Sequence, residues 1–368
     1  MKSGAGGPSC KVVRMGSLKR KGLPVISRIL VLLSCYDYRL EAEKFGVVKQ
    51  TIHPMVASAR KKYKPVYHIK DLRPLGFATI LATMRDRELW RKLANTNSVE
   101  YIENHVVLGR YVSSIVLTVD GHIIVTYNVP KILLDDAVSV VEKWYTDRQG
   151  EVVVGETMPV RNCAGVVGQL ALPSLEQHYH VARMFEEYRS RMPFMDYILL
   201  SILDHDPLLP LSDVRNLVHA IEARIEKEIG EGLLRYRYVL RHYRSLSEKG
   251  VLGRARIPKI IEEPKTAISI IAEEKCAPKL YAYAAAYLAS SRMFISKSTL
   301  VVGLYVPQTV VNRLAEEAYD CIIEAYVPVK GFLAPFPFEM YDPIRDEWSL
   351  EPVSQDIVNL LRKFRLLA

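Results

Sequence analysis

The chain has 368 residues and a net charge of +9, with 49% hydrophobic and 25% charged residues. These proportions exclude a mostly disordered, collagen-like or disulfide-stapled chain, and the length exceeds what one core of ordinary size accommodates. The longest apolar run near the N-terminus, Ile29 to Cys35, is far shorter than the roughly 20 residues that a bilayer crossing needs. No apolar signal core is visible, and the five cysteines show no CxxC spacing. We therefore expect a cytoplasmic chain without a membrane span.

Most of the positive charge lies at the N-terminal end. Residues 1–70 contain 15 Lys/Arg and 3 Asp/Glu, whereas the rest of the chain carries a small net negative charge. A segment this basic favours a polyanionic partner, because neutralised phosphates release condensed counterions and the field of the protein accelerates encounter. An anionic membrane surface is an alternative partner, and residues 1–22 alone could equally be a solvated arm that improves solubility.

Residues 40–62 have the pattern of a helix-turn-helix, and they follow a first helix that is expected to start at Pro24. Ala42 is small where two helices would touch, Gly46 suits the tight turn, and aliphatic residues then form the buried stripe of a second helix. Pro54 departs from the pattern, because it would start the regular helix late or kink it. If this helix enters a major groove, its polar face meets base edges and phosphates. The residues expected there are Lys49, Gln50, Thr51, His53, Ser58, Arg60, Lys61 and Lys62.

Period-two runs that alternate with helical spacing predict two β-α-β-β-α-β units in the rest of the chain. Right-handed crossovers would place both helices of each unit on one face of its sheet, which is the ferredoxin-like arrangement. In the first unit we expect strands at 75–84, 99–107, 111–119, 121–129 and 151–159 and helices at 85–95 and 131–146. In the second we expect strands at 267–273, 292–297, 299–306 and 324–330 and helices at 277–290 and 308–320.

The chain also resembles itself, which indicates an internal duplication. Residues 23–33 align with residues 192–202 at an offset of 169, and both segments read as helices that start at a proline. Residues 78–82 align with 268–272 at an offset of 190. Each copy then consists of helices followed by an α/β part. A helix at 175–192 is expected to connect the copies, and a helix at 353–366 is expected to close the chain.

A second basic segment, residues 233–257, contains seven Arg/Lys and one Glu. Val239, Leu240, Tyr243 and Leu246 would form the inward stripe of its helix, and Gly250 would end that helix before a basic strand at 251–257. This sequence of helix, glycine stop and basic strand resembles a winged helix. The alternative is a solvated amphipathic helix whose arginines pair with glutamates just upstream. The cationic residues expected to contact DNA are Arg235, Arg237, Arg241, Arg244, Arg254 and Arg256.

A winged helix followed by a ferredoxin-like sheet domain resembles the Lrp/AsnC family of prokaryotic transcription regulators, here in tandem. In that family the sheet domain assembles subunits and often senses amino acids, so the resemblance implies homodimer pairing and a small-molecule effector. The chain departs from the family in holding two copies, in an enlarged second helical unit, and in a poorly preserved glycine-rich effector pattern, of which Gly109 and Gly121 are the remnants.

The predicted fold is α+β, with two winged helix-turn-helix units that alternate with two ferredoxin-like domains. Its parts are a basic arm at 1–22, helix-turn-helix and ferredoxin-like domains at 23–72 and 73–165, a connecting helix at 166–192, winged-helix and ferredoxin-like domains at 193–262 and 263–340, and a C-terminal helix at 341–368.

The predicted function is sequence-specific regulation of transcription on double-stranded DNA, through two non-identical helix-turn-helix units joined in one chain. A scaffold or transcription-machinery factor that binds nucleic acid without sequence preference is the alternative. Siroheme decarboxylases resemble the same two-part architecture, but their His/Tyr/Arg and Trp-Pro-Tyr-Asn-like motifs are not found around His105 or Tyr111. Because no Walker loop, HExxH or GxSxG motif appears either, the sequence predicts no enzyme, no cofactor and no metal site.

Overall fold

The computed structural model describes residues 71–96, 98–160, 176, 179–180, 182–184, 193–205, 214–220, 223, 239–252, 265–287, 292–334, 336–342, 345 and 347–352. These residues form an α+β fold around one large, curled antiparallel sheet, so the predicted α+β class is confirmed. The helix-turn-helix pattern at 40–62, residues 253–257 of the predicted wing and the C-terminal helix at 353–366 lie outside the described residues.

The first half of the sheet is a β-α-β-β-α-β unit in which the first connection contains two helices. Its elements are β1 (Phe77–Met84), α5 (Arg87–Asn95), α6 (Val99–His105), β2 (Val112–Thr118), β3 (Ile123–Pro130), α7 (Leu134–Thr146) and β4 (Glu151–Pro159). The strands lie in the order β4-β1-β3-β2. Side chains alternate along β1, so that Ile80 and Ala82 pack with the helices while Leu81 faces the other half of the molecule. Helix α5 begins at Asp86, whose Oδ1 accepts a hydrogen bond from the amide of Leu89 at 2.9 Å.

The strand predicted at 99–107 is wrong, because most of these residues form α6. Ser98 caps this helix, and its Oγ accepts a hydrogen bond from the amide of Tyr101 at 3.2 Å. The apolar residues at Val99 and Tyr101 suggested a period of two, but the residues buried in the core are Ile102 and Val106, which have helical spacing. The Ser98 cap and the burial of residues four positions apart therefore favour a helix over the strand that the short alternating run predicts.

The second half of the sheet is a second β-α-β-β-α-β unit. Its elements are β5 (Lys265–Glu273), α12 (Ala277–Tyr287), β6 (Arg292–Ile295), β7 (Thr299–Pro307), α13 (Gln308–Ala318) and β8 (Ile322–Tyr326). The strands lie in the order β8-β5-β7-β6, which repeats the order of the first unit. The helices pack on one face over their own core, in which Ile270, Leu280 and Val302 are at most 1% exposed.

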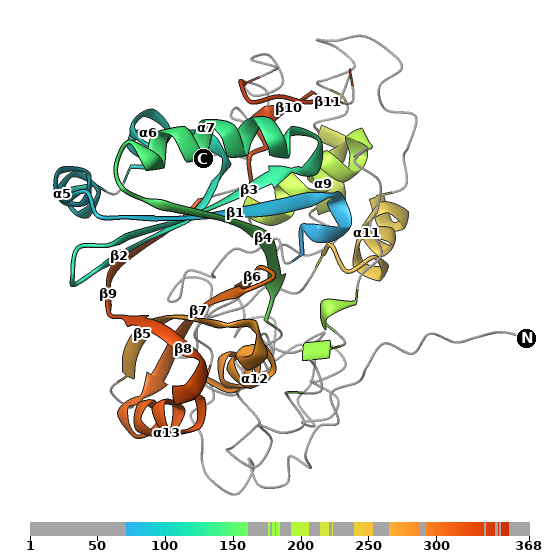
Figure 1. The fold of residues 1–368 in the computed structure, drawn as a ribbon. Coiled ribbons are helices and arrows are strands. Elements are labelled where there is room, and N and C mark those ends of the chain that lie inside the picture. Colours follow the sequence, from blue (N-terminus) through green and yellow to red (C-terminus); the bar gives the residue numbers. More distant parts are fainter. Residues whose placement is uncertain are drawn as a thin grey trace, which may run out of the picture.

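The end of each unit pairs with both halves of the sheet, through the single strand β4 in the first unit and through two successive strands in the second. β4 pairs with β1 through residues 151–155 and with β6 through residues 156–159. β8 pairs with β5, and the chain then continues as β9 (Pro328–Leu333), which pairs with β2 of the first unit. The single strand predicted at 324–330 is therefore two strands, because the chain changes partner at Val327. Figure 1 shows β9 crossing from one unit to the other, and this reciprocal exchange joins the strands of both units in one continuous sheet.

Lys330 fixes this crossing strand to the first unit. Its Nζ donates hydrogen bonds to the carbonyl oxygens of Leu93 at 3.5 Å and Ala94 at 2.8 Å, and it also contacts the carbonyl oxygen of Thr96. These carbonyls lie at or next to the C-terminal end of α5, where unsatisfied acceptors and the helix dipole favour a cation. The second unit thus caps a helix of the first.

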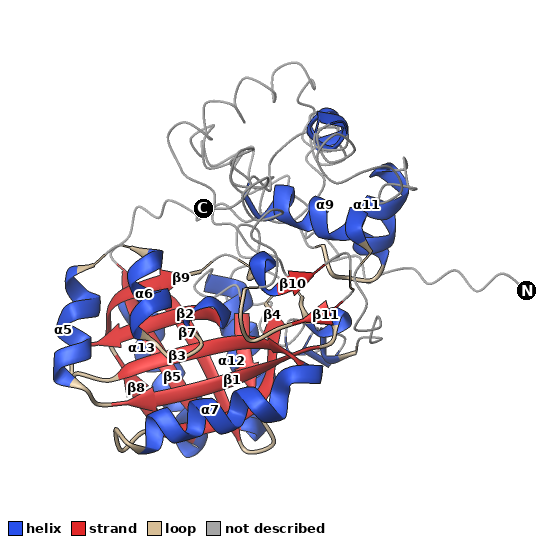
Figure 2. Ribbon diagram, turned by 90° about the horizontal axis from the view of Figure 1, so that it is seen from above, coloured by secondary structure: helices blue, strands red, loops and turns tan. Residues whose placement is uncertain are grey.

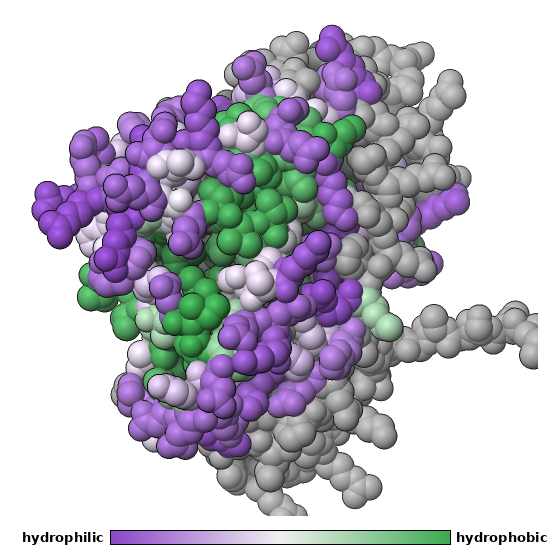
Figure 3. All heavy atoms as spheres, viewed as in Figure 1, coloured by the Kyte–Doolittle hydropathy of each residue, from purple (hydrophilic) through white to green (hydrophobic). Residues whose placement is uncertain are grey.

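Both units contribute to an apolar layer between the two halves of the sheet. Leu81 and Ile124 come from the first unit and Phe294 and Tyr326 from the second, and each is at most 8% exposed. On the face drawn in Figure 3, apolar side chains gather between the hydrophilic surfaces of the two units. Separating the units would expose this layer to water, so it stabilises their association.

The helices between the two units, α9 (Phe194–His205) and α11 (Val239–Glu248), lie at one end of the sheet (Figure 2). α9 follows Pro193 and α11 ends before Gly250, which has a φ of 76°, as the sequence predicts. The Tyr197 hydroxyl donates a hydrogen bond to the carbonyl of Phe338 at 2.9 Å. α9 therefore shares one core with the first unit, together with the short strands β10 (Tyr341–Asp342) and β11 (Glu347–Trp348).

Single turns of 3-10 helix link several of these elements. They are η1 (Arg73–Leu75), η2 (Gly109–Tyr111), η3 (Lys131–Leu133), η5 (Glu274–Cys276), η6 (Tyr319–Cys321) and η7 (Phe338–Met340).

A disulfide joins Cys276 at the start of α12 to Cys321 just after α13, a pairing that cysteine spacing alone did not predict. In the predicted connecting helix, Tyr179 is buried, but Met184, which the spacing places on the apolar face, is 81% exposed and not helical. Among the described residues, no helix has the length and apolar character that a bilayer crossing requires.

Candidate functional site

Two of the residues predicted to bind DNA lie in the described part of the chain. Arg241 and Arg244 are both exposed on α11, and their spacing of three places them on the same side of the helix. Leu240, predicted to point inward, is 45% exposed, so that prediction is wrong. The buried residues of α11 are Val239 and Leu246, which lie on the same side of the helix because they are two turns apart. Leu240 points away from that side. The twelve other predicted residues lie outside the described residues; they are Lys49, Gln50, Thr51, His53, Ser58, Arg60, Lys61, Lys62, Arg235, Arg237, Arg254 and Arg256.

A hydrogen bond between a histidine and a buried aspartate holds α11 against α9. The Nδ1 of His242 lies 2.5 Å from Oδ1 of Asp196, whose side chain is 1% exposed. A buried carboxylate is tolerated when it is hydrogen-bonded to a cationic or donor group. The basic face of α11 is therefore held at a fixed orientation to α9 and, through it, to the first unit.

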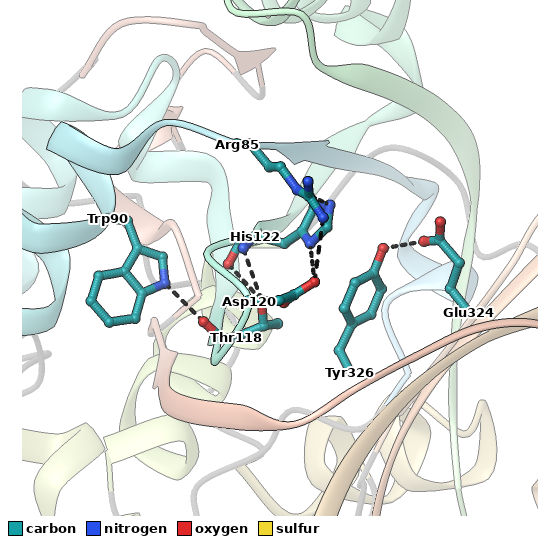
Figure 4. A network of polar contacts seen from close by, with 7 residues as sticks. All are labelled: Arg85, Trp90, Thr118, Asp120, His122, Glu324 and Tyr326. Atoms are coloured by element: carbon teal, nitrogen blue, oxygen red, sulfur yellow. Dashed lines mark hydrogen bonds and ion pairs between the residues drawn. The ribbon is translucent and has the colours of Figure 1, made fainter.

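A second group of polar residues lies where the two units meet, and the sequence analysis did not single it out. Arg85 follows β1 directly, Asp120 and His122 lie in the hairpin between β2 and β3, and Glu324 and Tyr326 lie on β8 of the other unit (Figure 4). We call these five residues the seam cluster. The exchange of strands between the units brings together residues that are more than 200 positions apart in the chain.

The hairpin that carries Asp120 and His122 is fixed by Thr118, which is fully buried. The Thr118 hydroxyl donates to Oδ1 of Asp120 at 2.6 Å and accepts from the amide of His122 at 2.9 Å. Gly121 has a φ of 89°, a conformation that glycine adopts without a steric penalty. The indole of Trp90, on α5, donates to the carbonyl of Thr118 at 3.1 Å. Side chains on two elements, β2 and α5, therefore set the position of the two titratable residues.

The hydrogen bonds of His122 define its tautomer. Its Nε2 lies 2.9 Å from Nε of Arg85, and because a guanidinium can only donate, Nε2 is the acceptor. Its Nδ1 then carries the proton and donates to Oδ2 of Asp120 at 2.8 Å. The side chain of His122 is 18% exposed, whereas that of Arg85 is 65% exposed. The cluster thus holds an imidazole whose Nε2 accepts a hydrogen bond near the surface, beside a cation that solvent can reach.

The neighbouring groups shift the pKa values of Asp120 and Tyr326 in opposite directions. Burial raises the pKa of the Asp120 carboxyl, but the hydrogen bonds from Thr118 and His122 together lower this pKa by more than burial raises it. The net shift of the pKa is therefore downward. Burial raises the pKa of the Tyr326 hydroxyl, and its hydrogen bond to the Glu324 carboxylate raises it more. The Tyr326 ring stands edge-on to the imidazole at 4.8 Å between centroids. Asp120 therefore stays ionised and Tyr326 stays protonated beside the histidine.

The equivalent position in the second unit holds no such cluster. There the hairpin between β6 and β7 contains Ser296, Lys297 and Ser298, and Gly155 of β4 takes the place that Tyr326 has on β8. A Cβ on Gly155 would lie 2.3 Å from the carbonyl oxygen of Ile295, so β4 and β6 pack directly against each other. The fold thus has two similar seams, and within the described residues one of them carries a histidine hydrogen-bonded to a carboxylate and an arginine.

Among the described residues, no group of three or more His, Cys, Asp or Glu side chains has an arrangement that could hold a metal ion. Within that part of the chain, the chemistry that the seam cluster offers is that of an anion-binding guanidinium beside a histidine able to accept a proton.

No family model and no curated protein matches this chain. Among solved structures, the crystal structure of the siroheme decarboxylase NirDL is 11% identical, with 92% of this chain and 99% of that chain covered and a TM-score of 0.49. The crystal structure of NirDL in co-complex with an iron-uroporphyrin III analogue is 15% identical, with 84% and 92% covered and a TM-score of 0.47. The protein in both matched structures is named as an enzyme, and the sequence-based prediction that this chain is not an enzyme is not maintained.

Proposed function

We propose that the chain binds a carboxylate-bearing ligand at the seam cluster and that His122 exchanges a proton with it. The observation that carries this proposal is the hydrogen bond of 2.9 Å between Nε of Arg85 and Nε2 of His122. It places a cation that binds carboxylates directly beside a nitrogen that transfers protons. Asp120 and Thr118 then hold the imidazole in one orientation.

Arg85 supplies the ligand-binding group. A guanidinium presents a planar fork of N–H donors that fits a carboxylate with two parallel hydrogen bonds. Nη2 of Arg85 lies 3.6 Å from Oδ2 of Asp120, but because the Arg85 side chain is 65% exposed, a ligand can reach the donors that face neither the imidazole nor Asp120. A carboxylate bound to this fork draws Arg85 away from Nε2, and the freed nitrogen then lies beside the ligand.

His122 supplies the proton-transfer group. Its Nδ1 is held by Asp120, so Nε2 is the nitrogen that gains and loses a proton, and the Asp120 carboxylate stabilises the imidazolium form. Decarboxylation is a reaction that uses such a pair. Nε2 first takes a proton from solvent, which gives the imidazolium. The carbon–carbon bond to the carboxylate then breaks, carbon dioxide leaves, and the electron pair left on carbon takes that proton from Nε2, which restores the neutral imidazole.

Ligand titration tests this proposal. We expect siroheme, the compound named for the matched decarboxylase, or a simple di- or tricarboxylate to bind the purified chain, followed by absorbance for siroheme and by calorimetry for the others. Arg85→Gln should weaken binding by about tenfold or more, because it removes a charge-assisted pair worth about 1.5–3 kcal/mol. Lys92→Gln, which removes an exposed cation of α5 outside the cluster, should leave the affinity unchanged. Absence of binding by every carboxylate, or equal affinity of the two variants, would overturn the proposal.

Binding to double-stranded DNA is a second proposed function, favoured by the exposed Arg241 and Arg244 of α11. The ion pair between His242 and Asp196 fixes the helix from behind, so both arginines project from a rigid surface. The strongly basic residues 1–70 would add further phosphate contacts. The predicted sequence-specific regulator, with one helix-turn-helix unit in each copy, is the form of this function that the Lrp/AsnC resemblance implies.

The salt dependence of DNA affinity tests this second function. Each phosphate contact contributes about 0.9 to the slope of log affinity against log salt concentration, so Arg241→Ala/Arg244→Ala should reduce the slope by about 2. The measurement is fluorescence anisotropy with a fragment selected from genomic DNA. The matched control, Lys92→Ala/Lys275→Ala, removes two exposed lysines from the β-α-β-β-α-β units and should leave the slope unchanged. An equal slope in all three proteins would contradict phosphate contact by α11.

A further inference from the structure

A groove of about 560 Å³ lies along α7 and reaches Val154 of β4. Figure 1 shows this helix beside β4. Apolar side chains form part of its surface, and Val154 of β4 is 40% exposed there. The residues that line it are Leu134, Asp135, Val138, Ser139, Glu142, Lys143, Thr146, Asp147 and Val154. None of them belongs to the seam cluster or to α11.

One wall of this groove is a strand edge. β4 pairs with β1 through residues 151–155, but its pairing with β6 begins only at residue 156. Within the described residues, the edge of 151–155 that faces away from β1 therefore has no strand beside it. Such an edge presents unpaired backbone N–H and C=O groups, to which an extended segment can add as a further strand.

The charge of the groove indicates what kind of segment fits. Asp135, Glu142 and Asp147 are exposed acidic residues along its length, against the single cation Lys143. A complementary segment is basic and extended, with small apolar side chains that can contact Val138 and Val154.

The chain itself contains such a segment. Residues 1–22 have six Lys/Arg and no Asp/Glu, and Val12 and Val13 stand between Lys11 and Arg14. The 48 residues from 23 to 70 span at most about 3.3–3.6 Å each when extended, which is enough to reach any surface of the protein, and the covalent link gives the segment a high effective concentration. We propose that the basic arm, residues 1–22, binds in the α7–β4 groove by adding a strand to the free edge of β4. The bound arm is then unavailable to a polyanion, so the groove and nucleic acid compete for it.

Hydrogen–deuterium exchange of the full-length chain tests this inference. In the wild-type protein the outward-facing amides within residues 151–155 should exchange at least tenfold more slowly than in the groove variant Glu142→Lys/Asp147→Lys. The arm variant Lys11→Glu/Arg14→Glu should show the same loss of protection. Asp136→Lys is the matched control, because Asp136 is an exposed carboxylate of α7 that does not line the groove, and it should behave like the wild type.

A labelled peptide of residues 1–22 provides the second measurement. Added to the full-length arm variant, it should restore protection at 151–155, and it should fail to do so in a chain that carries the groove and arm substitutions together. Protection that is lost in the groove variant but kept in the arm variant would show that another segment occupies the groove, and equal exchange in all variants would show that nothing does. Either result overturns the proposal.

Discussion

Replacement of His122 by asparagine is expected to lower kcat for a carboxylate substrate by roughly 10²- to 10⁴-fold, the contribution of a positioned general acid or base. Asparagine keeps a polar group of similar size at this position, but it cannot carry a proton at neutral pH. Arg85 and Asp120 remain, so the Kd of the carboxylate should change by less than about threefold. The measurement is the rate of carbon dioxide release, together with the Kd from the ligand titration.

His105→Asn is the matched control for this prediction. His105 is an exposed histidine of the same unit, its Nδ1 contacts the carbonyl of Tyr101 at 2.8 Å, and it lies outside the seam cluster. We expect its kcat to stay within about twofold of the wild-type value, since an exposed residue away from the chemistry contributes little. A kcat for His122→Asn as high as that of the control would remove His122 from the reaction, even if the ligand still binds at Arg85.

Asp120 should set the acid limit of the same activity. The pKa of its carboxyl is lowered in the folded protein, because the hydrogen bonds from Thr118 and His122 outweigh the effect of burial. The ionised form is therefore retained until the pH falls below the ordinary range near 4, and loss of kcat through Asp120 is expected only below about pH 4. Because the pKa of Asp120 is lower in the folded than in the unfolded protein, ionised Asp120 stabilises the fold at every pH above its unfolded pKa. This stabilisation is lost as the pH falls through the pKa that Asp120 has in the folded protein.

The order of elements could be predicted from the sequence because it rests on local patterns. The alternation along β1 and the helical spacing of α7 are visible in short windows, and so is the proline that precedes α9. Helix α6 was mistaken for β structure because a run of seven residues is short enough to satisfy either period. The change of partner at Val327 was missed for a different reason: the residues of β8 and β9 look like one continuous strand, and only the position of β2 shows that they pair with different units.

The seam cluster could not be predicted for a similar reason. The Asp120-Gly121 pair marks a hairpin turn, and this was the one local signal that polar side chains gather at its tip. Arg85 lies beside His122 because of the register of β1 with β3. Tyr326 stands edge-on to His122 because β8 and β9 pass from one unit to the other. The pairing of Cys276 with Cys321 likewise depends on how the ends of α12 and α13 approach in space. Contacts set by long-range topology have no counterpart in residue spacing.

His242→Ala is expected to lower the free energy of unfolding by about 3–5 kcal/mol, the cost of removing one partner from a buried ion pair. Asp196 is 1% exposed, and His242 is the partner that the structure gives its carboxylate at 2.5 Å. Without the imidazole, the carboxylate is left buried and uncompensated in the core that α9 shares with the first unit. The measurement is chemical denaturation followed by circular dichroism, with the midpoint and slope fitted together.

The double variant Asp196→Leu/His242→Leu separates the charge from the packing. Replacement of a buried ion pair by apolar side chains of similar volume is often neutral or stabilising, so this variant should recover most of the lost free energy of unfolding. It should also keep α11 in place, so that Arg241 and Arg244 remain presented and the salt slope of DNA binding matches that of the wild type. If the double variant were as unstable as His242→Ala, His242 would stabilise the protein through contacts other than the one with Asp196. The buried carboxylate would then not be the reason for the loss of stability in His242→Ala.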